Sequence, residues 1–223
     1  QLFDEASSTF TYLLVCEHSG EAVLIDPVRE QQARDAALLE GGGWRLRWVL
    51  DTHVHADHVT GARALASRFG ARCAVGQACE AACYDQALRD GDRLDFGQEH
   101  LAVIATPGHT PGSMSFLWRD QVFTGDALLI GGCGRTDLQQ GDAGQLYDAI
   151  TGRLFTLPDG TRVYPGHDYQ GRTESSIAEE RLHNRRLAGR SRDEFIALMG
   201  SLDLPPPRLL EVAVPLNRQA GGP

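Results

Sequence analysis

Four potential metal ligands crowd into one turn of the sequence. The run Thr52-His-Val-His-Ala-Asp-His58 places His53, His55, Asp57 and His58 directly after a predicted strand. Neutral imidazole and carboxylate groups together form the ligand set that borderline divalent metals prefer in proteins. A lone histidine is usually a core or surface residue, but this cluster predicts a metal site.

Three later residues share one local setting, a tight turn at the end of a predicted strand. They are His109 after Thr106-Pro-Gly, Asp126 after Thr124-Gly, and His167 after Pro165-Gly. Each alone is read more simply as a capping, buried or turn residue. Because all three follow the triple-histidine turn in the same context, we predict that they join the metal site. The other histidines lack this setting and are predicted to lie at the surface: His18, His100 and His183.

These motifs as a set resemble the metallo-β-lactamase superfamily, whose αβ/βα sandwich binds metals at one edge. Three longer runs are similar to the persulfide dioxygenases: Thr52–Gly61, Phe123–Asp137 and Tyr164–Tyr169. The resemblance spans nearly the whole chain. It implies an α/β fold, an αβ/βα sandwich of two mixed β-sheets flanked by helices. It also implies a single domain over residues 1–223, with a short helical C-terminal extension from about residue 170.

The resemblance to persulfide dioxygenases also implies a cofactor and a reaction. One iron(II) per chain would be bound by the catalytic residues His53, His109 and Asp126. Four surrounding residues would orient these ligands: His55, Asp57, His58 and His167. Two imidazoles and one carboxylate leave three octahedral positions open, enough for O2 as co-substrate and a sulfur donor. The implied reaction converts glutathione persulfide, O2 and water to sulfite and glutathione, in hydrogen sulfide catabolism.

The same seven donors also permit a dinuclear zinc or iron thioester hydrolase of glyoxalase II type. In that arrangement two ligand trios would hold two metals bridged by Asp126: His53, His55 and His109 for one, and Asp57, His58 and His167 for the other. Glyoxalase II-like enzymes carry a substantial helical C-terminal domain for glutathione. Here only 54 residues follow Tyr169, and none is Lys, which favours the dioxygenase. A third alternative, a degenerate metal or thiol sensor, is disfavoured because all seven donors are present.

Four residues are predicted to contact the substrate. Glutathione brings carboxylates to a chain of net charge −9, so a local cation is required. Arg135 is the first candidate because guanidinium pairs bidentately with carboxylate; a salt bridge to Asp137 is its alternative. Tyr169 is predicted to donate a hydrogen bond near the open metal positions, with core packing as its alternative. Asn217 and Arg218, in a terminal segment that resembles the family's, are predicted to close the pocket.

Composition restricts the partners and the classes of enzyme. With 21 basic and 30 acidic residues the chain has no broad basic surface, and no apolar run approaches the roughly 18 residues of a membrane span. All basic residues are Arg, which excludes a Schiff-base lysine and a Walker P-loop. We expect no nucleic-acid and no membrane partner, and a homodimer is compatible with the sequence. The location is expected to be the cytoplasm of a bacterium or, where a leader has been removed, the mitochondrial matrix.

The five cysteines form no CxxC pair, which favours a reducing compartment. Cys133, in the glycine-rich loop, is interpreted as a loop residue beside the metal rather than a nucleophile, because the sequence positions no base near it.

The predicted elements place the metal donors at strand ends. Strands are expected over residues 9–16, 21–26, 46–51, 101–105, 113–118, 121–124, 162–164 and 209–214, and helices over 30–39, 141–154 and 172–187. A further helix, capped by Asp57, is expected to end at Gly70. Strands mixed with helices in this order favour two packed sheets with helices outside. Polar residues that follow the strands would then gather along one edge.

Overall fold

Two six-stranded β-sheets form the computed structural model, which describes residues 1–222. In the first sheet the spatial order follows the sequence: β1 (Leu2–Asp4), β2 (Thr9–Cys16), β3 (Glu21–Ile25), β4 (Arg45–Leu50), β5 (Arg72–Gly76) and β6 (Gln86–Leu88). The first three strands pair antiparallel, whereas β3 to β6 pair parallel. The predicted hairpin of β2 and β3 is confirmed.

The second sheet has the spatial order β12-β11-β10-β9-β8-β7. Its strands are β7 (Arg93–Phe96), β8 (Glu99–Ala105), β9 (Met114–Trp118), β10 (Gln121–Gly125), β11 (Arg162–Pro165) and β12 (Ser175–Ser176). Only β10 and β11 pair parallel among these strands, so this sheet is also mixed. The predicted sandwich of two mixed sheets is therefore confirmed.

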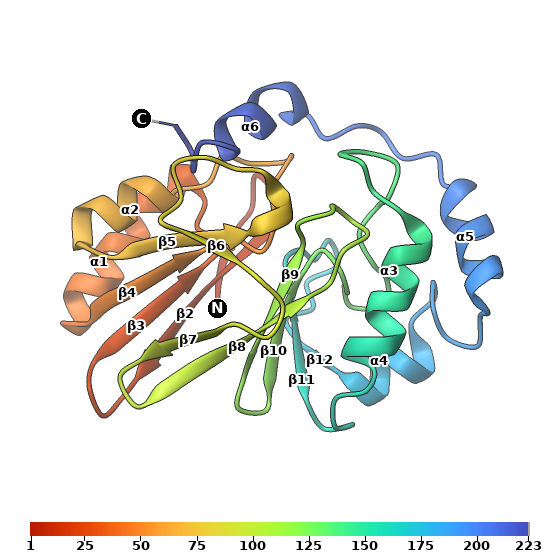
Figure 1. The fold of residues 1–223 in the computed structure, drawn as a ribbon, viewed down its shortest axis with the longest axis horizontal. Helices are drawn as coiled ribbons and strands as arrows, with labels where there is room; N and C mark the ends of the chain where they lie inside the picture. The colour runs from red at the N-terminus through yellow and green to blue at the C-terminus, as the bar shows by residue number, and fades with distance from the viewer. Residues whose placement is uncertain (223) are drawn as a thin grey trace.

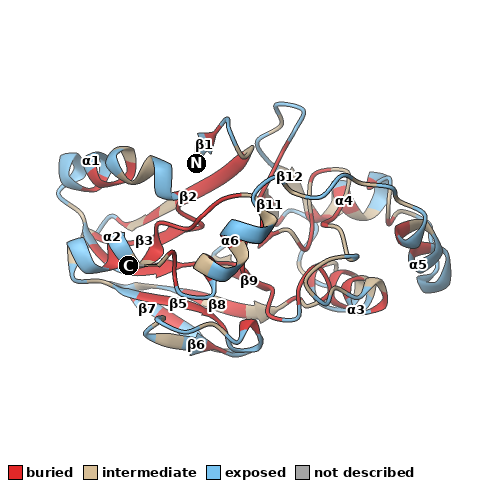
Figure 2. Ribbon diagram, turned by 90° about the horizontal axis from the view of Figure 1, so that it is seen from above, coloured by how far each residue is buried: buried red, intermediate tan, exposed pale blue. Residues whose placement is uncertain are grey.

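Helices flank the two sheets (Figure 1). The regular helices are α1 (Gln32–Gly42), α2 (Ala62–Phe69), α3 (Ala143–Ala149), α4 (Ile177–His183), α5 (Arg192–Gly200) and α6 (Leu210–Asn217). Short turns add Arg29–Gln31, Gln77–Cys79 and a π-helical turn, Ile150–Leu154. Leu39 of α1 and Leu65 of α2 pack with Val49 of the first sheet. Ile177 of α4 and Phe195 of α5 belong to the cluster over the second sheet. Figure 2 shows buried strands between helices whose outer faces are exposed.

A third apolar cluster lies between the sheets. Alternate residues of β2, from Phe10 through Tyr12, point into it because side chains alternate along a strand. Phe96, Phe116 and Phe123 meet them from the second sheet. Burying each such side chain contributes about 1.5–3 kcal/mol, so this layer holds the two sheets, and the loops at their ends, together.

Three expectations about local structure are wrong. The predicted helix 172–187 is the shorter α4, because residues 175–176 pair with β11 and the Ser176 hydroxyl caps the helix by accepting from Glu179 N. The predicted terminal strand 209–214 is the helix α6, whose buried residues Ala213 and Asn217 lie four apart on one face. Asp57 does not cap α2, which begins after Gly61; its carboxylate bonds to other side chains.

The segment after α5 leads back to the first sheet. Ala220 packs in the cluster of α1 and α2, and its carbonyl accepts a hydrogen bond from Arg63 N at 3.2 Å. Among residues 1–222, no helix is long and apolar enough to cross a membrane. The assignment of the whole chain to one domain stays a prediction.

Candidate metal centre

His53, His109 and Asp126 converge at one edge of the sandwich. One ligand atom from each lies within 4.8 Å of those of the other two. His53 lies in the loop after β4, His109 in the loop after β8, and Asp126 directly follows β10. His109 Nε2 is 3.7 Å from Asp126 Oδ2, and the two imidazole rings stand nearly perpendicular, at 86°. Three donors from three separate loops can therefore reach one ion.

Two glycines allow these loops to approach so closely. Gly125 has a φ of +50°, and a Cβ at this position would lie 2.5 Å from Thr52 Oγ1. A Cβ at Gly134 would lie 2.3 Å from the carbonyl oxygen of Asp126 and 2.8 Å from His109 Nδ1. Real Cβ atoms do not approach other atoms this closely, so a side chain at either position would displace the donors.

Each donor is oriented by a hydrogen bond to its other polar atom. His109 Nδ1 donates to the Arg135 carbonyl at 2.7 Å, which leaves Nε2 free for a metal. The Thr52 hydroxyl donates to Asp26, so it accepts from His53 Nδ1 at 3.0 Å, and His53 Nε2 stays unprotonated. Fixing the tautomer and the ring plane in this way is typical of metal-binding histidines.

Burial and charge keep His53 and Asp126 in their metal-binding protonation states. Burial lowers the pKa of His53 well below its usual value, and nearby His55 and His109 add to this effect. Burial alone would raise the pKa of Asp126, but His167 lowers it to a net value well below the usual range. The centre therefore offers neutral imidazole and ionised carboxylate.

The other four donors form a neighbouring group. Asp57 Oδ2 lies 2.8 Å from His58 Nδ1 and 2.9 Å from His167 Nε2. His167 Nδ1 lies 2.6 Å from Asp126 Oδ1, so His167 connects the two groups. His55 Nε2 lies 3.0 Å from Asp26 Oδ1.

Unpartnered nitrogens in this region fit a cation. His55 Nδ1 and His58 Nε2 are buried and have no hydrogen-bond partner within residues 1–222, although such atoms are nearly always bonded. Ring centroids lie 4.1 Å apart for His53 and His55 and 4.3 Å apart for His55 and His58, so these nitrogens belong to the same region. Together with the imidazole and carboxylate donors, they support a bound divalent metal as cofactor.

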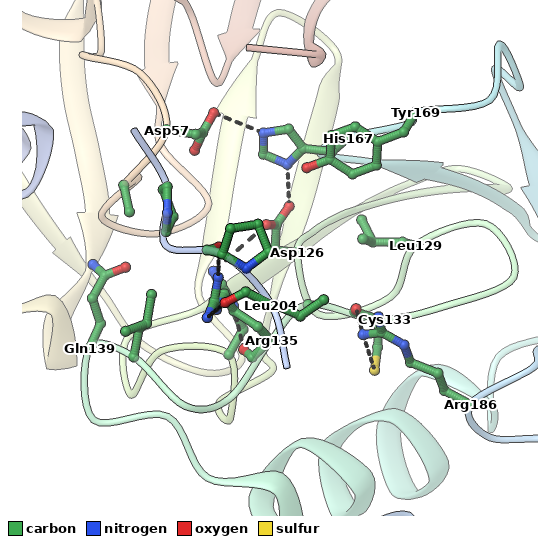
Figure 3. Close-up of a pocket in the computed structure, with 16 residues that line it drawn as sticks. Asp57, Asp126, Leu129, Cys133, Arg135, Gln139, His167, Tyr169, Arg186 and Leu204 are labelled. Atoms are coloured by element: carbon green, nitrogen blue, oxygen red, sulfur yellow. Dashed lines mark hydrogen bonds and ion pairs between the residues drawn. The ribbon is translucent and has the colours of Figure 1, made fainter. Parts of the chain in front are cut away.

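A cavity of about 460 Å³ opens onto the donors. His109, Asp126 and His167 line it, and Leu204 and Tyr169 belong to its walls. Figure 3 shows His167 between Asp57 and Asp126, with the ring of Tyr169 beside it. The volume falls within the range of small-molecule sites, so a ligand can reach the metal here.

Known proteins share this fold and much of this sequence. The sequence profile of the metallo-β-lactamase superfamily matches residues 5–78 and 84–167. The human mitochondrial persulfide dioxygenase ETHE1 is 48% identical over 99% of this chain and 87% of its own length. The crystal structure of ETHE1 from Myxococcus xanthus has a TM-score of 0.97 and 54% identity over 99% of this chain and 98% of that one. The chain belongs to the persulfide dioxygenases of the metallo-β-lactamase superfamily.

A more distant relative is a hydrolase, the enzyme class of the alternative function. The hydroxyacylglutathione hydrolase of Anaeromyxobacter dehalogenans is 40% identical, but over only 72% of this chain and 61% of its own length. The predicted resemblance to the superfamily and to the persulfide dioxygenases is thus confirmed. The roles of individual residues in this persulfide dioxygenase have to be inferred from the geometry of the site.

Two of the predicted substrate residues line the cavity. Arg135 forms a bidentate pair with Asp137, at 2.7 and 2.6 Å, and also donates to the carbonyls of Leu204 and Pro205. The salt-bridge alternative for Arg135 is therefore observed. Tyr169 does not pack in the core: it is 73% exposed, and its ring lies parallel to that of His167 with centroids 6.1 Å apart.

Asn217 holds the ligand turn instead of facing the cavity. Its side chain is 1% exposed; Oδ1 accepts from Thr60 N at 2.8 Å, and Nδ2 donates to the carbonyls of His55 and His58 at 2.9 and 2.8 Å. Neither Asn217 nor the exposed Arg218 is among the described residues that line the cavity of about 460 Å³. We therefore interpret Asn217 as a positioning residue for the metal-binding turn.

Several residues that build the site were not predicted. Thr9 Oγ1 lies 3.1 Å from both Asp57 Oδ2 and His167 Nε2. Asp26 accepts from Thr52 N at 2.7 Å and from the Thr52 hydroxyl. Asp26 precedes Pro27 and looks like an ordinary turn residue in the sequence, and Thr9 like an ordinary strand residue. Asp26 has a φ of +50°, and the side chains of both Asp26 and Thr9 are buried. Only the structure shows these features.

Proposed function

We propose that this persulfide dioxygenase binds one iron(II) ion through His53, His109 and Asp126 and oxidises glutathione persulfide. Both atoms of O2 and the oxygen of one water end on the terminal sulfur, which leaves as sulfite while glutathione and two protons are released. The observation that carries the proposal is the convergence of one atom from each of the three residues within 4.8 Å, with His109 and Asp126 both lining the cavity. His55, Asp57 and His58 converge equally closely, but of these three only Asp57 lines the cavity.

The donor set suits a redox-active ion. Two imidazoles and a carboxylate on one face of an octahedron leave three positions open. Iron(II) held by His53, His109 and Asp126 would supply electrons for O2 activation and would leave room for a sulfur donor. A zinc hydrolase needs only a Lewis acid and a water molecule.

Residues around the donors hold them in the productive arrangement. The Arg135 carbonyl fixes the ring of His109, and Thr52 fixes that of His53. His167 Nδ1 donates a hydrogen bond to Asp126 Oδ1. The other oxygen, Oδ2, is left 3.7 Å from His109 Nε2. Removing such partners usually changes metal affinity or activity by about 10- to 100-fold.

Hydrogen bonding within the second donor group supports one ion rather than two. Asp57 Oδ2 already bonds to His58 and His167. A second ion bound through His167 Nε2 would have to replace the hydrogen bond between His167 and Asp57. In our proposal His55, Asp57, His58 and His167 therefore orient the ligands of a single ion.

The cavity provides for the rest of the substrate. Leu129, Leu138 and Leu204 line it and limit the access of water to the reacting sulfur. In our proposal Tyr169, exposed beside His167, donates its hydroxyl hydrogen to a ligand at the open positions. Holding the persulfide sulfur and O2 side by side replaces an improbable encounter with a positioned one.

We propose a small-molecule persulfide as the only substrate class, with no nucleic-acid or membrane partner. The compartment we propose is the cytoplasm or, for a chain whose leader has been removed, the mitochondrial matrix. The human relative is named as a mitochondrial protein, which supports the second setting.

A dinuclear thioester hydrolase remains the alternative function. It is favoured by the presence of all seven donors and by the buried, unpartnered His58 Nε2, which lies beside Asp57. The similarity to hydroxyacylglutathione hydrolase points the same way, although it covers less of both chains.

Metal analysis combined with two substrates tests the proposal. The purified protein is loaded anaerobically with iron(II), and O2 uptake and sulfite release are measured with glutathione persulfide. Hydrolysis of a glutathione thioester is measured in parallel, with iron and with zinc. About one iron per chain, with equal O2 uptake and sulfite release, supports the dioxygenase; two zinc ions per chain with thioester hydrolysis overturns it.

A further inference from the structure

His53 and His109 reach the proposed metal position from loops that are far apart in the sequence. His53 follows β4 and His109 follows β8, and the centroids of their rings lie 4.8 Å apart. A functional site keeps its geometry only when its side chains are held to within about 0.5 Å, so one loop has to be fixed relative to the other. The loop 135–142 is hydrogen-bonded to both of them.

The loop 135–142 is bonded to the turn of His109 at both of its ends. The Arg135 carbonyl accepts a hydrogen bond from His109 Nδ1 at 2.7 Å. At the other end Asp142 N donates to the Gly108 carbonyl at 2.8 Å, and the Asp142 side chain caps α3. Because both ends are anchored in this way, the loop keeps a fixed position relative to His109.

Gln139 extends from the middle of this loop to the turn of His53. Its Nε2 donates to the carbonyl oxygen of Val54 at 2.8 Å, and Val54 is the residue that follows His53. Gln139 is half-buried and lines the cavity of about 460 Å³. Figure 3 shows it on the side of the cavity away from Arg186. The side chain of Gln139 therefore links the loop bonded to His109 with the turn that carries His53.

The backbone that directs this side chain is strained. Gln139 and Gln140 have φ angles of +47° and +59°, in the left-handed region that residues other than glycine rarely adopt. Gly141 N closes the turn by donating to the Leu138 carbonyl at 2.8 Å. Strained residues persist where the surrounding structure holds them, and they cluster at functional sites. Here the strained pair places the amide of Gln139 against Val54.

The hydrogen bond from Gln139 restrains a buried part of the metal-binding turn. Val54 is 4% exposed, so its carbonyl oxygen needs a donor from the protein. The next carbonyl, that of His55, accepts its hydrogen bond from Asn217 in α6 at 2.9 Å. The turn is thus held by side chains from two different parts of the chain, and the one that comes from the cavity wall is Gln139.

We propose that Gln139 is a positioning residue that sets the separation of His53 and His109 for metal binding. The proposal rests on the proposed function, since it takes these two histidines as ligands of one ion. Gln139 acts on His53 through Val54, and on His109 through the loop 135–142. Its loss leaves every proposed ligand present but allows the two turns to move independently, which weakens metal binding and disturbs the open positions.

Two variants remove the hydrogen bond, and a third is the control. Gln139→Ala removes the side chain. Gln139→Glu keeps its size but places a carboxylate oxygen, which cannot donate, opposite the Val54 carbonyl. Gln140→Ala is the matched control, because it changes the exposed neighbouring residue, which has the same type of strained backbone.

Hydrogen exchange in the metal-free proteins shows whether Gln139 holds the turn. In both Gln139 variants, the peptide that contains residues 52–58 should exchange about ten-fold faster or more by mass spectrometry. Peptides from β2 and α4, and every peptide of Gln140→Ala, should exchange as in wild type. If neither Gln139 variant shows a difference confined to residues 52–58, the proposal is overturned, whatever reaction the protein catalyses.

Cobalt(II) binding and kinetics show whether the effect reaches the metal. Both Gln139 variants should bind cobalt(II) about ten-fold more weakly with a shifted visible spectrum, and Gln140→Ala should stay within about two-fold of wild type. With saturating iron(II), kcat for glutathione persulfide should fall about ten-fold while KM stays within about two-fold. A raised KM with unchanged kcat and cobalt spectrum would make Gln139 a substrate contact and overturn the proposal. If wild type consumes no O2 with the persulfide, the proposed function fails, while hydrogen exchange still tests Gln139.

Discussion

His167 Nδ1 lies 2.6 Å from Asp126 Oδ1, so one possible metal donor holds another in place. The other ring nitrogen lies 2.9 Å from Asp57 Oδ2. Burial alone would lower the pKa of His167, but the two carboxylates raise it well above the usual value. Both ring nitrogens therefore carry hydrogens and donate, and Asp126 is left with one oxygen for a metal.

Replacing His167 by Ala should leave the metal in place and slow the reaction. Because His167 contacts Asp126 from the side away from His109, its loss frees an oxygen without removing a donor of the proposed trio. We expect about one iron per chain and a kcat lower by about 10- to 100-fold. Metal analysis and O2 uptake check this, with the exposed His183→Ala as control. A variant purified without iron would count against the single-ion assignment.

Replacing His53 by Ala should abolish both metal binding and activity. His53 supplies one of the three proposed donors, and His109 and Asp126 alone would not hold an ion tightly against water. Titration with cobalt(II), followed by visible absorption, measures affinity independently of turnover. His100→Ala removes an exposed histidine and should behave as wild type. Full metal occupancy in the His53 variant would exclude the trio.

The parts of the fold that follow from short-range patterns were predictable. The hairpin of β2 and β3 shows in two β-rich runs around Gly20, and the end of α1 in Gly43, whose φ of +63° suits glycine. The convergence of the three proposed metal donors was predictable because His53, His109 and Asp126 all follow strands, and strand ends meet at one edge of a sheet.

Features that depend on contacts distant in sequence were not predictable. The apolar residues after Pro207 fit a strand as well as a helix, and only burial of Ala213 and Asn217 on one face selects α6. Asn217 bonds to Thr60, 157 residues earlier, and no local pattern encodes that contact. For Arg135 the sequence left two alternatives, a substrate contact and a salt bridge to Asp137, and the structure shows the salt bridge at the cavity wall.

Replacing Asn217 by Ala should loosen the metal-binding turn. The change leaves Thr60 N and the carbonyls of His55 and His58 buried without partners, at about 1–3 kcal/mol for each unpaired group. We expect the metal-free protein to lose about 3 kcal/mol of unfolding free energy in urea, and cobalt(II) affinity to fall as well. Asn217→Asp keeps the acceptor for Thr60 N but loses both donors, so it should not restore metal affinity.

The exposed Gln219→Ala, two residues further along, is the control for Asn217. A substrate contact at Asn217 would instead raise KM with unchanged stability and metal affinity. That outcome would return Asn217 to the role of closing the pocket.

Alkylation should distinguish the exposed thiol from the buried ones. Cys83 is exposed, whereas the other four cysteines are buried. Burial raises the pKa of Cys73 and Cys79 to about 12 and that of Cys133 to about 11. The thiolate is the reactive form, so these three thiols stay unreactive at pH 8 and still at pH 9. A hydrogen bond with Ser19 lowers the pKa of Cys16, and that thiol is shielded by its burial alone, with 2% of its surface exposed.

We expect iodoacetamide to modify one thiol per folded chain, mapped by mass spectrometry to Cys83, and five in urea. Cys83→Ser should abolish the native-state labelling. Rapid labelling of Cys133 in the folded protein would contradict its interpretation as an unreactive loop residue beside the metal.

Replacing Gly134 by Ala should weaken metal binding without adding or removing any donor. The new Cβ would lie 2.3 Å from the Asp126 carbonyl oxygen and 2.8 Å from His109 Nδ1, so both loops must move apart. That movement separates His109 Nε2 from Asp126 Oδ2, now 3.7 Å apart, and we expect cobalt(II) affinity to fall about 10- to 100-fold. Gly41→Ala is the matched control: its Cβ meets nothing within 4 Å, and in helix α1 alanine should stabilise the protein by about 0.5–1 kcal/mol. If both variants bound cobalt(II) as wild type does, the close approach at Gly134 would have no part in shaping the centre.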